Sequence, residues 1–312
     1  MTRALSTPMI GALCAVGASA AFTLNDMSVK VLSGGYPLHQ VILIRSTLGL
    51  LILLVAVVPF AGGLAAIKTR RPGMHMIRGG FVLFANMMFF LALAAMPIAD
   101  ATAIFFVSPL LIGIYSVVFL GETVGPRRWL AISAGLAGAV VMIRPGTDAF
   151  TPVALLPLLA AAGYAGLHTM TRKMGVSESA VTMSFYIQVT FIAFSAAMGL
   201  GVGDGRLDPG GDAALSFLLR EWVAPQLADW PFFLLAGIGT GIGGLLISQA
   251  YRSCEAALIA PLEYAAMPMA IFWGVMVFGE WPEPVAWLGI TLILGAGIYM
   301  IFRETRVNRP RF

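Results

Sequence analysis

The chain has 312 residues, of which 59% are hydrophobic and only 11% are charged, and its mean hydropathy is +0.90. A soluble domain carries about 25% charged residues, so this composition excludes an ordinary soluble fold and indicates a lipid bilayer as the surroundings. The net charge of +4 is spread over short segments without interleaved aromatic residues, which excludes a nucleic-acid interface. The two cysteines have neither metal-ligand nor disulfide spacing, and we expect no metal and no cofactor.

Ten apolar windows of about 20 residues, the length that crosses the hydrocarbon core, follow one another along the chain. The segments between them are short, apart from a Gly- and Asp-containing stretch at about 201–228. We therefore predict an all-α membrane protein with ten transmembrane helices and with its functional site among them. The windows are roughly 8–32, 38–60, 76–95, 98–120, 127–143, 152–171, 178–200, 229–250, 257–278 and 284–302.

The two halves of the chain resemble each other. Residues 92–122 align with residues 250–280 without a gap at an offset of 158. Nearer the N-terminus, a second alignment at an offset of 143 pairs Lys30 with Lys173. Each copy holds five predicted spans, an odd number, so the second copy enters the membrane from the opposite side. We predict two inverted five-helix repeats, residues 1–147 and 148–312, with a substrate site between them.

Lysine and arginine residues indicate the orientation of these spans. Fourteen of them, Arg78 among them, lie on one side of the predicted membrane and four on the other, with Arg45 inside a span. Because cytoplasmic loops carry the excess of basic residues, both termini are expected in the cytoplasm. The predicted location is a bacterial-type inner membrane, crossed several times.

Ionisable side chains inside a span are costly and are expected to have a function and a partner. Glu263 lies in the ninth span, and its repeat mate is Phe105, so its carboxylate is not shared by both halves. It would balance a cationic substrate group or bind a proton; alternatively, it forms a structural ion pair or a protonated, hydrogen-bonded acid. The ionisable residues predicted inside spans are Asp26, Lys30, Arg45, His168 and Glu263.

Arg45 is the next candidate, and its repeat mate is Gln188. The planar fork of donors on a guanidinium suits a carboxylate or phosphate. Alternatively, Arg45 forms a salt bridge with Asp26, or its long side chain snorkels to the outer interface. Asp26 and Lys30 are four residues apart, so they share a helix face and could neutralise each other. For His168, an interfacial position near the end of its span is expected.

Aromatic residues in the fourth, ninth and other predicted spans form a second layer of candidates. Their faces attract ammonium and sulfonium groups through cation–π interactions, although each ring alone could equally be packing. Pro109 in the fourth span, with Pro261 and Pro268 in the ninth, interrupts the helices that carry Glu263 and its mate, and such breaks free backbone groups to meet a substrate. The aromatic candidates are Phe89, Phe105, Phe106, Tyr251, Tyr264 and Trp273.

The stretch GTGIGG at 239–244 matches a dinucleotide-binding pattern, but it lies inside a span with no strand before it. Its small residues instead indicate close helix packing, either within one chain or between two. No acidic cluster suited to Mg²⁺ occurs on a cytoplasmic loop. We therefore expect that the chain is not an enzyme.

The chain resembles the drug/metabolite transporter superfamily, specifically its ten-span EamA-type members. The resemblance rests on the duplicated five-helix units, FLGE at 119–122, FGE at 278–280, the tryptophans Trp129 and Trp287, and APLEY at 260–264. It implies a central cavity lined mainly by the third, fourth, eighth and ninth spans, and alternating access by rocking of helix bundles. Members carry amino acids, S-adenosylmethionine, riboflavin or other small organic molecules, and the APLEY stretch is similar to that of amino-acid and S-adenosylmethionine carriers.

Together these features predict a secondary active, proton-coupled transporter of a small zwitterionic or cationic metabolite, such as an amino acid, S-adenosylmethionine or a methylated amine. Glu263 would hold the positive group or the coupling proton and Arg45 a carboxylate, with Asp26, Gln188 and the aromatic candidates completing the site. The expected partners are the substrate, the bilayer and protons, with the chain a monomer or a homodimer. The alternatives are a broad efflux carrier for hydrophobic cations and a membrane-embedded enzyme or non-transporting subunit.

Overall fold

The computed structural model describes residues 7–121, 125–147, 150–174, 178–253 and 262–307, and every regular element within these ranges is helical. The first half contains α1 (Thr7–Leu32), α2 (Leu38–Ile52), α3 (Pro72–Ala95), α4 (Ile98–Phe105), α5 (Ser108–Leu120) and α6 (Pro126–Ile143). The second half contains α7 (Leu155–Met174), α8 (Ala180–Val202), α9 (Ala213–Leu219), α10 (Trp230–Ser253), α12 (Ala266–Phe278) and α13 (Pro284–Val307). Each predicted span thus has a helix in the matching part of the described chain.

Seven helices of the described chain are long and apolar enough to cross a membrane. Large apolar side chains face outward, with Val55 73%, Leu130 69% and Met276 64% exposed, as a lipid-facing surface requires. The all-α membrane architecture is therefore confirmed, whereas ten crossings remain a prediction. The seven are Met9–Leu32, Leu38–Ala61, Pro72–Ala95, Ile98–Phe119, Pro152–Thr171, Ala180–Val202 and Leu227–Ile247; shorter apolar helices at Trp129–Ile143, Ala266–Phe278 and Pro284–Ala296 match the other three windows.

Local sequence explains two departures from the predicted spans. The stretch 201–228, expected to be a loop, contains the short helix α9, and Asp212 caps it by accepting a hydrogen bond from the backbone N–H of Leu215 at 2.8 Å. The third span begins at Pro72 rather than at residue 76, because proline suits the first position of a helix, where no N–H is needed. Arg78 consequently lies well inside α3 and is buried.

The predicted interruption of the fourth span is present, and the second half repeats it. Residues 106–107 form a turn between α4 and α5, and residues 264–265 form a turn directly before α12. The two turns are 158 residues apart, which is the offset of the sequence repeat. A proline follows each turn within a few residues, and the helix is interrupted there because proline has no N–H to donate to the preceding turn. The same backbone hydrogen bond of 3.1 Å occurs in both, from Val107 N to the Ile104 carbonyl and from Ala265 N to the Leu262 carbonyl.

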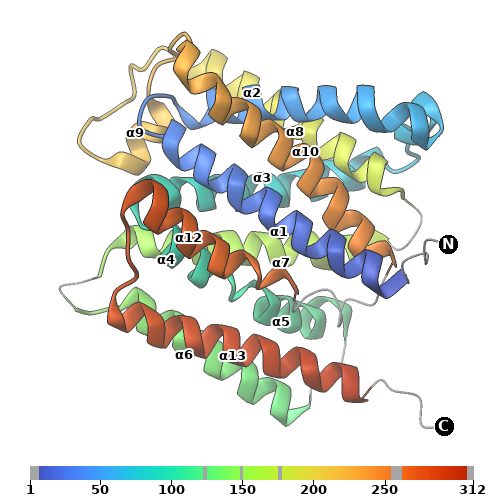
Figure 1. Cartoon of the computed structure of the whole chain (residues 1–312), viewed down its shortest axis with the longest axis vertical. Coiled ribbons are helices and arrows are strands. Elements are labelled where there is room, and N and C mark those ends of the chain that lie inside the picture. The colour runs from blue at the N-terminus through green and yellow to red at the C-terminus, as the bar shows by residue number, and fades with distance from the viewer. Residues whose placement is uncertain (1–6, 122–124, 148–149, 175–177, 254–261, 308–312) are drawn as a thin grey trace, which may run out of the picture.

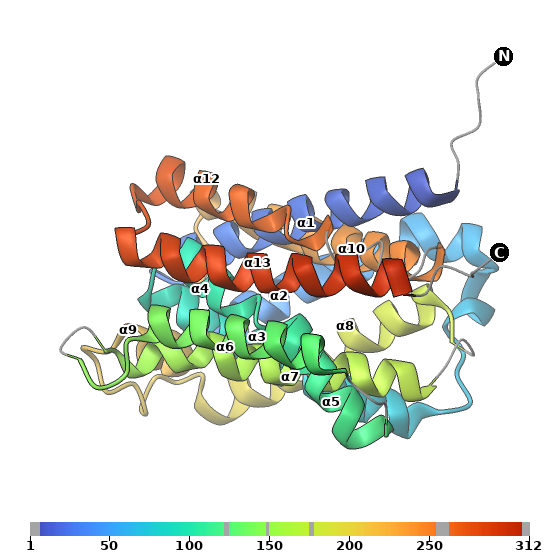
Figure 2. The same ribbon diagram turned by 90° about the horizontal axis from the view of Figure 1, so that it is seen from below.

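The main helix contacts between the two halves of the described chain come in corresponding pairs. α1 lies along α10 and α3 lies along α7; α5 contacts α7 and α12 contacts α1; α2 packs on α8 and α6 on α13. The pair α6 and α13 lies at one side of the bundle, at the bottom of Figure 1. Figures 1 and 2 show that α1 begins and α13 ends at the same end of the bundle.

The glycine-rich stretch packs within this chain. Gly237 and Gly241 of α10 face α2, where a Cβ added at Gly237 would lie 2.6 Å from Leu48 Cβ. On the adjacent face, a Cβ added at Gly239 would lie 2.5 Å from the Ala21 carbonyl oxygen of α1. Alternate glycines therefore let α10 approach α1 and α2 together, as small residues do in membrane helix packing.

Candidate functional site

Arg45 of α2 is buried among four other helices. Its guanidinium donates hydrogen bonds to Asn25 Oδ1 of α1 at 2.9 Å, to Thr240 Oγ1 of α10 at 2.9 Å and to Asn86 Oδ1 of α3 at 3.2 Å. Its Cζ also lies 4.7 Å from the ring centroid of Phe90 of α3 and 5.1 Å from that of Phe191 of α8. The side chain is 1% exposed, so it does not snorkel to the interface. We call this group the arginine cluster.

Asp26 joins the arginine cluster through Asn25. Asn25 Nδ2 donates to Asp26 Oδ1 at 2.9 Å while its own Oδ1 accepts from Arg45, and the described contacts include no direct ion pair between Asp26 and Arg45. The two charges still interact through space. The salt bridge considered as one alternative for Arg45 is therefore not direct, since the Asn25 amide lies between the two side chains and bonds to both. Lys30 pairs with Glu280, 2.8 Å away, rather than with Asp26.

Aromatic rings from both halves form a second group beside the arginine cluster. Phe105 of α4 lies 5.1 Å from Phe89 of α3 and 5.2 Å from Tyr164 of α7, measured between ring centroids. At the facing helix breaks, Phe106 and Tyr264 pack edge to face at 5.0 Å. These two are repeat mates, so the breaks of the two halves meet there. We call Phe89, Phe105, Phe106, Tyr164, His168 and Tyr264 the aromatic cluster.

Glu263 lies at the edge of the aromatic cluster. The Tyr164 side chain is hydrogen-bonded to Glu263, and the carboxylate also interacts electrostatically with the neighbouring Tyr264. Ser19 of α1 holds the backbone here by donating to the Glu263 carbonyl at 3.4 Å. The Tyr264 hydroxyl is buried and has no hydrogen-bond partner among the described residues. His168, expected at an interface, packs edge to face on Tyr164 at 4.4 Å.

The remaining predicted site residues lie elsewhere. Gln188 is buried on α8 against Gly49, one turn beyond Arg45, and its Oε1 has no hydrogen-bond partner among the described residues. Trp273 lines an apolar groove of about 380 Å³ between α1 and α12. The side chain of Tyr251 and the whole of Pro261 lie outside the described residues. No three His, Cys, Asp or Glu side chains of the described chain converge as a metal site.

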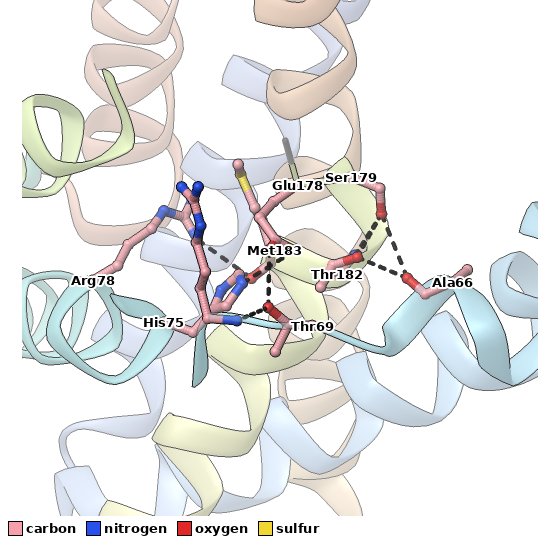
Figure 3. Close-up of polar contacts among 9 residues, drawn as sticks. Ala66, Thr69, His75, Arg78, Glu178, Ser179, Thr182 and Met183 are labelled. Carbon is pink, nitrogen blue, oxygen red and sulfur yellow. Dashed lines mark hydrogen bonds and ion pairs between the residues drawn. The ribbon is translucent and has the colours of Figure 1, made fainter. Parts of the chain in front are cut away.

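A polar corner joins the beginnings of α3 and α8 (Figure 3). Glu178 accepts a hydrogen bond from Thr69 at 2.9 Å, and its carboxylate lies 3.4 Å from His75 Nε2. His75 stacks on Tyr186 at 4.6 Å, and one turn further along α3 Arg78 donates to Thr171 of α7 at 3.0 Å. Arg78, counted among the orientation charges, thus ties helices together.

Several residues of the two clusters were not predicted from the sequence. Asn86 and Thr240, which bind Arg45, and Tyr164, beside Glu263, are polar residues whose repeat mates are Gly244, Val82 and Ala21. Glu263 and Arg45 were selected as ionisable residues inside spans, whereas these three would have been found by comparing every polar span residue with its repeat mate. Phe90 and Phe191 carry no such signal, because phenylalanine is common throughout the spans.

Comparison with known proteins adds to this geometry. The EamA-like transporter family model matches residues 9–144. The chain is 30% identical over 247 residues to a riboflavin transporter of Rhizobium johnstonii, covering 79% of this chain and 76% of that protein. It is 26% identical over 306 residues to an S-adenosylmethionine uptake transporter of Rickettsia prowazekii, covering 98% and 97%. A solved crystal structure shares the fold, with a TM-score of 0.63 and 22% identity over 97% of this chain and all of that one.

Proposed function

The chain belongs to the EamA-like transporter family of the drug/metabolite transporter superfamily and is a multi-pass membrane transporter of a small molecule, and for it we propose a substrate class, a coupling ion and a transport mechanism. It carries a zwitterionic or cationic organic metabolite across a bacterial-type inner membrane as a proton-coupled secondary transporter. Its two halves, residues 1–147 and 148–312, act as inverted repeats with ten crossings and cytoplasmic termini. Substrate binds between them in alternating access.

The observation that carries this proposal is a carboxylate beside aromatic faces at the junction of the two halves. Glu263 adjoins Tyr164 and Tyr264, whose rings pack on Phe105 and Phe106. A cationic group gains from both the carboxylate and the rings, and gains most where water is excluded. An ammonium or sulfonium group therefore suits this site better than an anion does.

The packing of the helices supports inverted repeats. Exchanging the halves maps α1 on α10 to α7 on α3, and α12 on α1 to α5 on α7, so each of these contacts corresponds to another contact in the described structure. Contact between the mates Phe106 and Tyr264 supports a pseudo-twofold axis near the aromatic cluster. A substrate at that axis would be reached equally from either end as the halves rock.

Proton coupling is assigned to Glu263, because its carboxylate can hold either the positive group of the substrate or a proton, but not both. Arg45 is a less direct ligand. Its guanidinium already donates to three neutral oxygens, and only its Nε has no hydrogen-bond partner among the described residues. We propose that Arg45 does not bind the substrate directly, and that its positive charge attracts the substrate carboxylate from a distance.

The test combines ligand binding with transport. Purified protein is screened by thermal stability against S-adenosylmethionine, amino acids, methylated amines and riboflavin, since a ligand of the folded state raises the unfolding temperature. Glu263→Gln is expected to abolish the shift with the cationic ligand and the response of uptake to a pH gradient in proteoliposomes. Glu283→Gln, which alters an exposed carboxylate paired with Arg144, is the matched control. Normal, pH-driven uptake by Glu263→Gln would refute the proposal.

A planar, uncharged heteroaromatic substrate of the riboflavin kind is the second candidate. It is favoured by the 30% identity to the Rhizobium johnstonii transporter and by the number of rings in the aromatic cluster, which can stack on a planar substrate. The two candidates differ in their need for the carboxylate. If riboflavin raises the unfolding temperature equally in the parent and in Glu263→Gln, the second candidate is correct.

A further inference from the structure

An ion pair closes the bundle at the end where α1 finishes. Lys30, in the last turn of α1, places its Nζ 2.8 Å from Glu280 Oε1 and 3.1 Å from Oε2. Glu280 follows α12 after Gly279, whose φ of 67° is a left-handed conformation that only glycine adopts without strain. The Lys30 side chain is 10% exposed and the Glu280 side chain 27%, so the pair is largely but not completely buried. We call this pair the Lys30–Glu280 lock.

The lock also holds the junction between α3 and α4. Lys30 Nζ donates to the Met96 carbonyl at 2.6 Å, and the backbone N–H of Ile98 donates to Glu280 Oε2 at 3.3 Å. The Phe278 ring lies under the ammonium, with its centroid 5.0 Å away. One ion pair therefore joins α1 and α4 of the first half to α12 of the second.

The lock and the aromatic cluster lie at opposite ends of α4. Phe105 is seven residues along α4 from Ile98, about 10 Å at 1.5 Å per residue. In the second half of the chain, Glu263 precedes α12 and Glu280 follows it. Separation of α4, α12 and α1 at the lock would thus open the facing helix breaks to water from this end alone.

The sequence repeats the same residue types in the other half of the chain. Lys173 is the mate of Lys30 and Glu122 is the mate of Glu280, although their side chains lie outside the described part of the structure. Gly121, the mate of Gly279, has nearly the same left-handed φ, 69° against 67°. Glu263 and Arg45 are not repeated in this way, so the repeated residue types fit a role tied to the symmetry of the two halves better than a role in binding the substrate.

We propose that Lys30 and Glu280 are the gating residues for one end of the transport path, and that breaking their ion pair lets water and substrate reach the aromatic cluster from that end. The inference rests on the proposed alternating access. A partly exposed pair suits this role, because hydration of the separated charges offsets much of what their attraction contributes. The closed lock is the state in this structure.

Accessibility of a single cysteine tests the lock without any substrate. Cys14 and Cys254 are replaced, and a cysteine is placed at Thr102, which is buried on α4 between the lock and Phe105. A membrane-impermeant maleimide is applied to right-side-out and to inside-out vesicles. Glu280→Gln and Lys30→Met are each expected to raise the labelling rate from the lock's side on the order of ten-fold, as loss of a charged hydrogen-bonded pair shifts a two-state equilibrium.

Glu283→Gln is the matched control, because it breaks the exposed Arg144–Glu283 pair near the same end and should label like the parent. The charge swap Lys30→Glu with Glu280→Lys should return labelling toward the parental rate. Parental labelling in both single variants would overturn the inference, and so would an equal increase from both sides, which means unfolding. If labelling changes as expected while no metabolite is transported, the proposed substrate function fails and the lock stands.

Discussion

Arg45→Met should be among the most damaging single substitutions in the chain. The change keeps an unbranched apolar side chain but removes the donors to Asn25, Thr240 and Asn86. A buried group left without its partner costs about 1–3 kcal/mol. Since the three acceptors would relax in part, we expect a loss of about 3–5 kcal/mol in the free energy of unfolding, the range seen when one partner of a buried charged network is removed.

The measurement is thermal unfolding of purified protein in detergent. A loss of that size corresponds to a fall of roughly 10 °C, at about 2–4 °C per kcal/mol for a chain somewhat smaller than this one. Arg206→Met is the control, because Arg206 forms an exposed pair with Asp204, with side chains 67% and 56% exposed, and should change little. An unfolding temperature of Arg45→Met within 2 °C of the parent, about the effect of a surface substitution, would refute the reasoning.

A double substitution tests the bridge to Asp26. If Asn25 couples the two charges, removing Arg45 leaves Asp26 uncompensated, so Asp26→Asn should restore part of the stability lost in Arg45→Met. The double variant should then be at least about 1 kcal/mol more stable than the sum of the single losses predicts. Strict additivity, within about 0.5 kcal/mol, would show that the carboxylate does not need the guanidinium.

Two further substitutions test packing and a loop contact. Gly239→Ala should destabilise the protein by about 1–3 kcal/mol in thermal unfolding, because its Cβ would lie 2.5 Å from the Ala21 carbonyl oxygen. Gly295→Ala, with no atom within 4 Å of the added Cβ, should be neutral, and equal losses in both variants would contradict this account. Tyr36→Phe removes the 2.6 Å hydrogen bond to Asp229 and should cost about 1–3 kcal/mol, read as faster proteolysis of the segment before α10; parental proteolysis would be the opposite result.

The fold could be predicted from the sequence in most of its elements, because apolar length is a strong signal in a membrane protein. The break in the fourth span was predicted from Pro109, and the turn lies just before that proline, at residues 106–107. The short helix α9 was not predicted, since its seven residues are too few to show a periodic pattern, and only Asp212 indicates where it begins. Which glycines face which helix could not be read from sequence either, because alternate positions of α10 contact different partners.

The candidate site could be predicted in part. Glu263 and two of its predicted aromatic neighbours, Phe106 and Tyr264, lie together at the helix breaks that the prolines of the fourth and ninth spans indicated. Arg45 was expected to meet a carboxylate, whereas it meets two amides and a hydroxyl. A sequence shows which residues are costly to bury, but the partners that reduce this cost come from other helices, at positions that only packing determines.

The arginine cluster changes how a loss of transport should be interpreted. Arg45→Ala was the natural test between a specific carrier of zwitterions and a broad efflux carrier, but Arg45 joins α1, α2, α3 and α10 by hydrogen bonds. Its loss would impair either kind of carrier by destabilising the fold alone.

Phe105→Ala distinguishes the two kinds of carrier better than a substitution of Arg45 does. This ring contacts Phe89 and Tyr164 without a polar bond of its own, so its truncation removes a surface proposed to bind the substrate and leaves the hydrogen-bonded frame intact. A specific carrier should then lose affinity for its own metabolite, with KM rising more than about ten-fold if the stacked ring supplies 1.4 kcal/mol or more. A broad carrier of hydrophobic cations, with many weak contacts, should show similar small changes across a panel of unrelated cations.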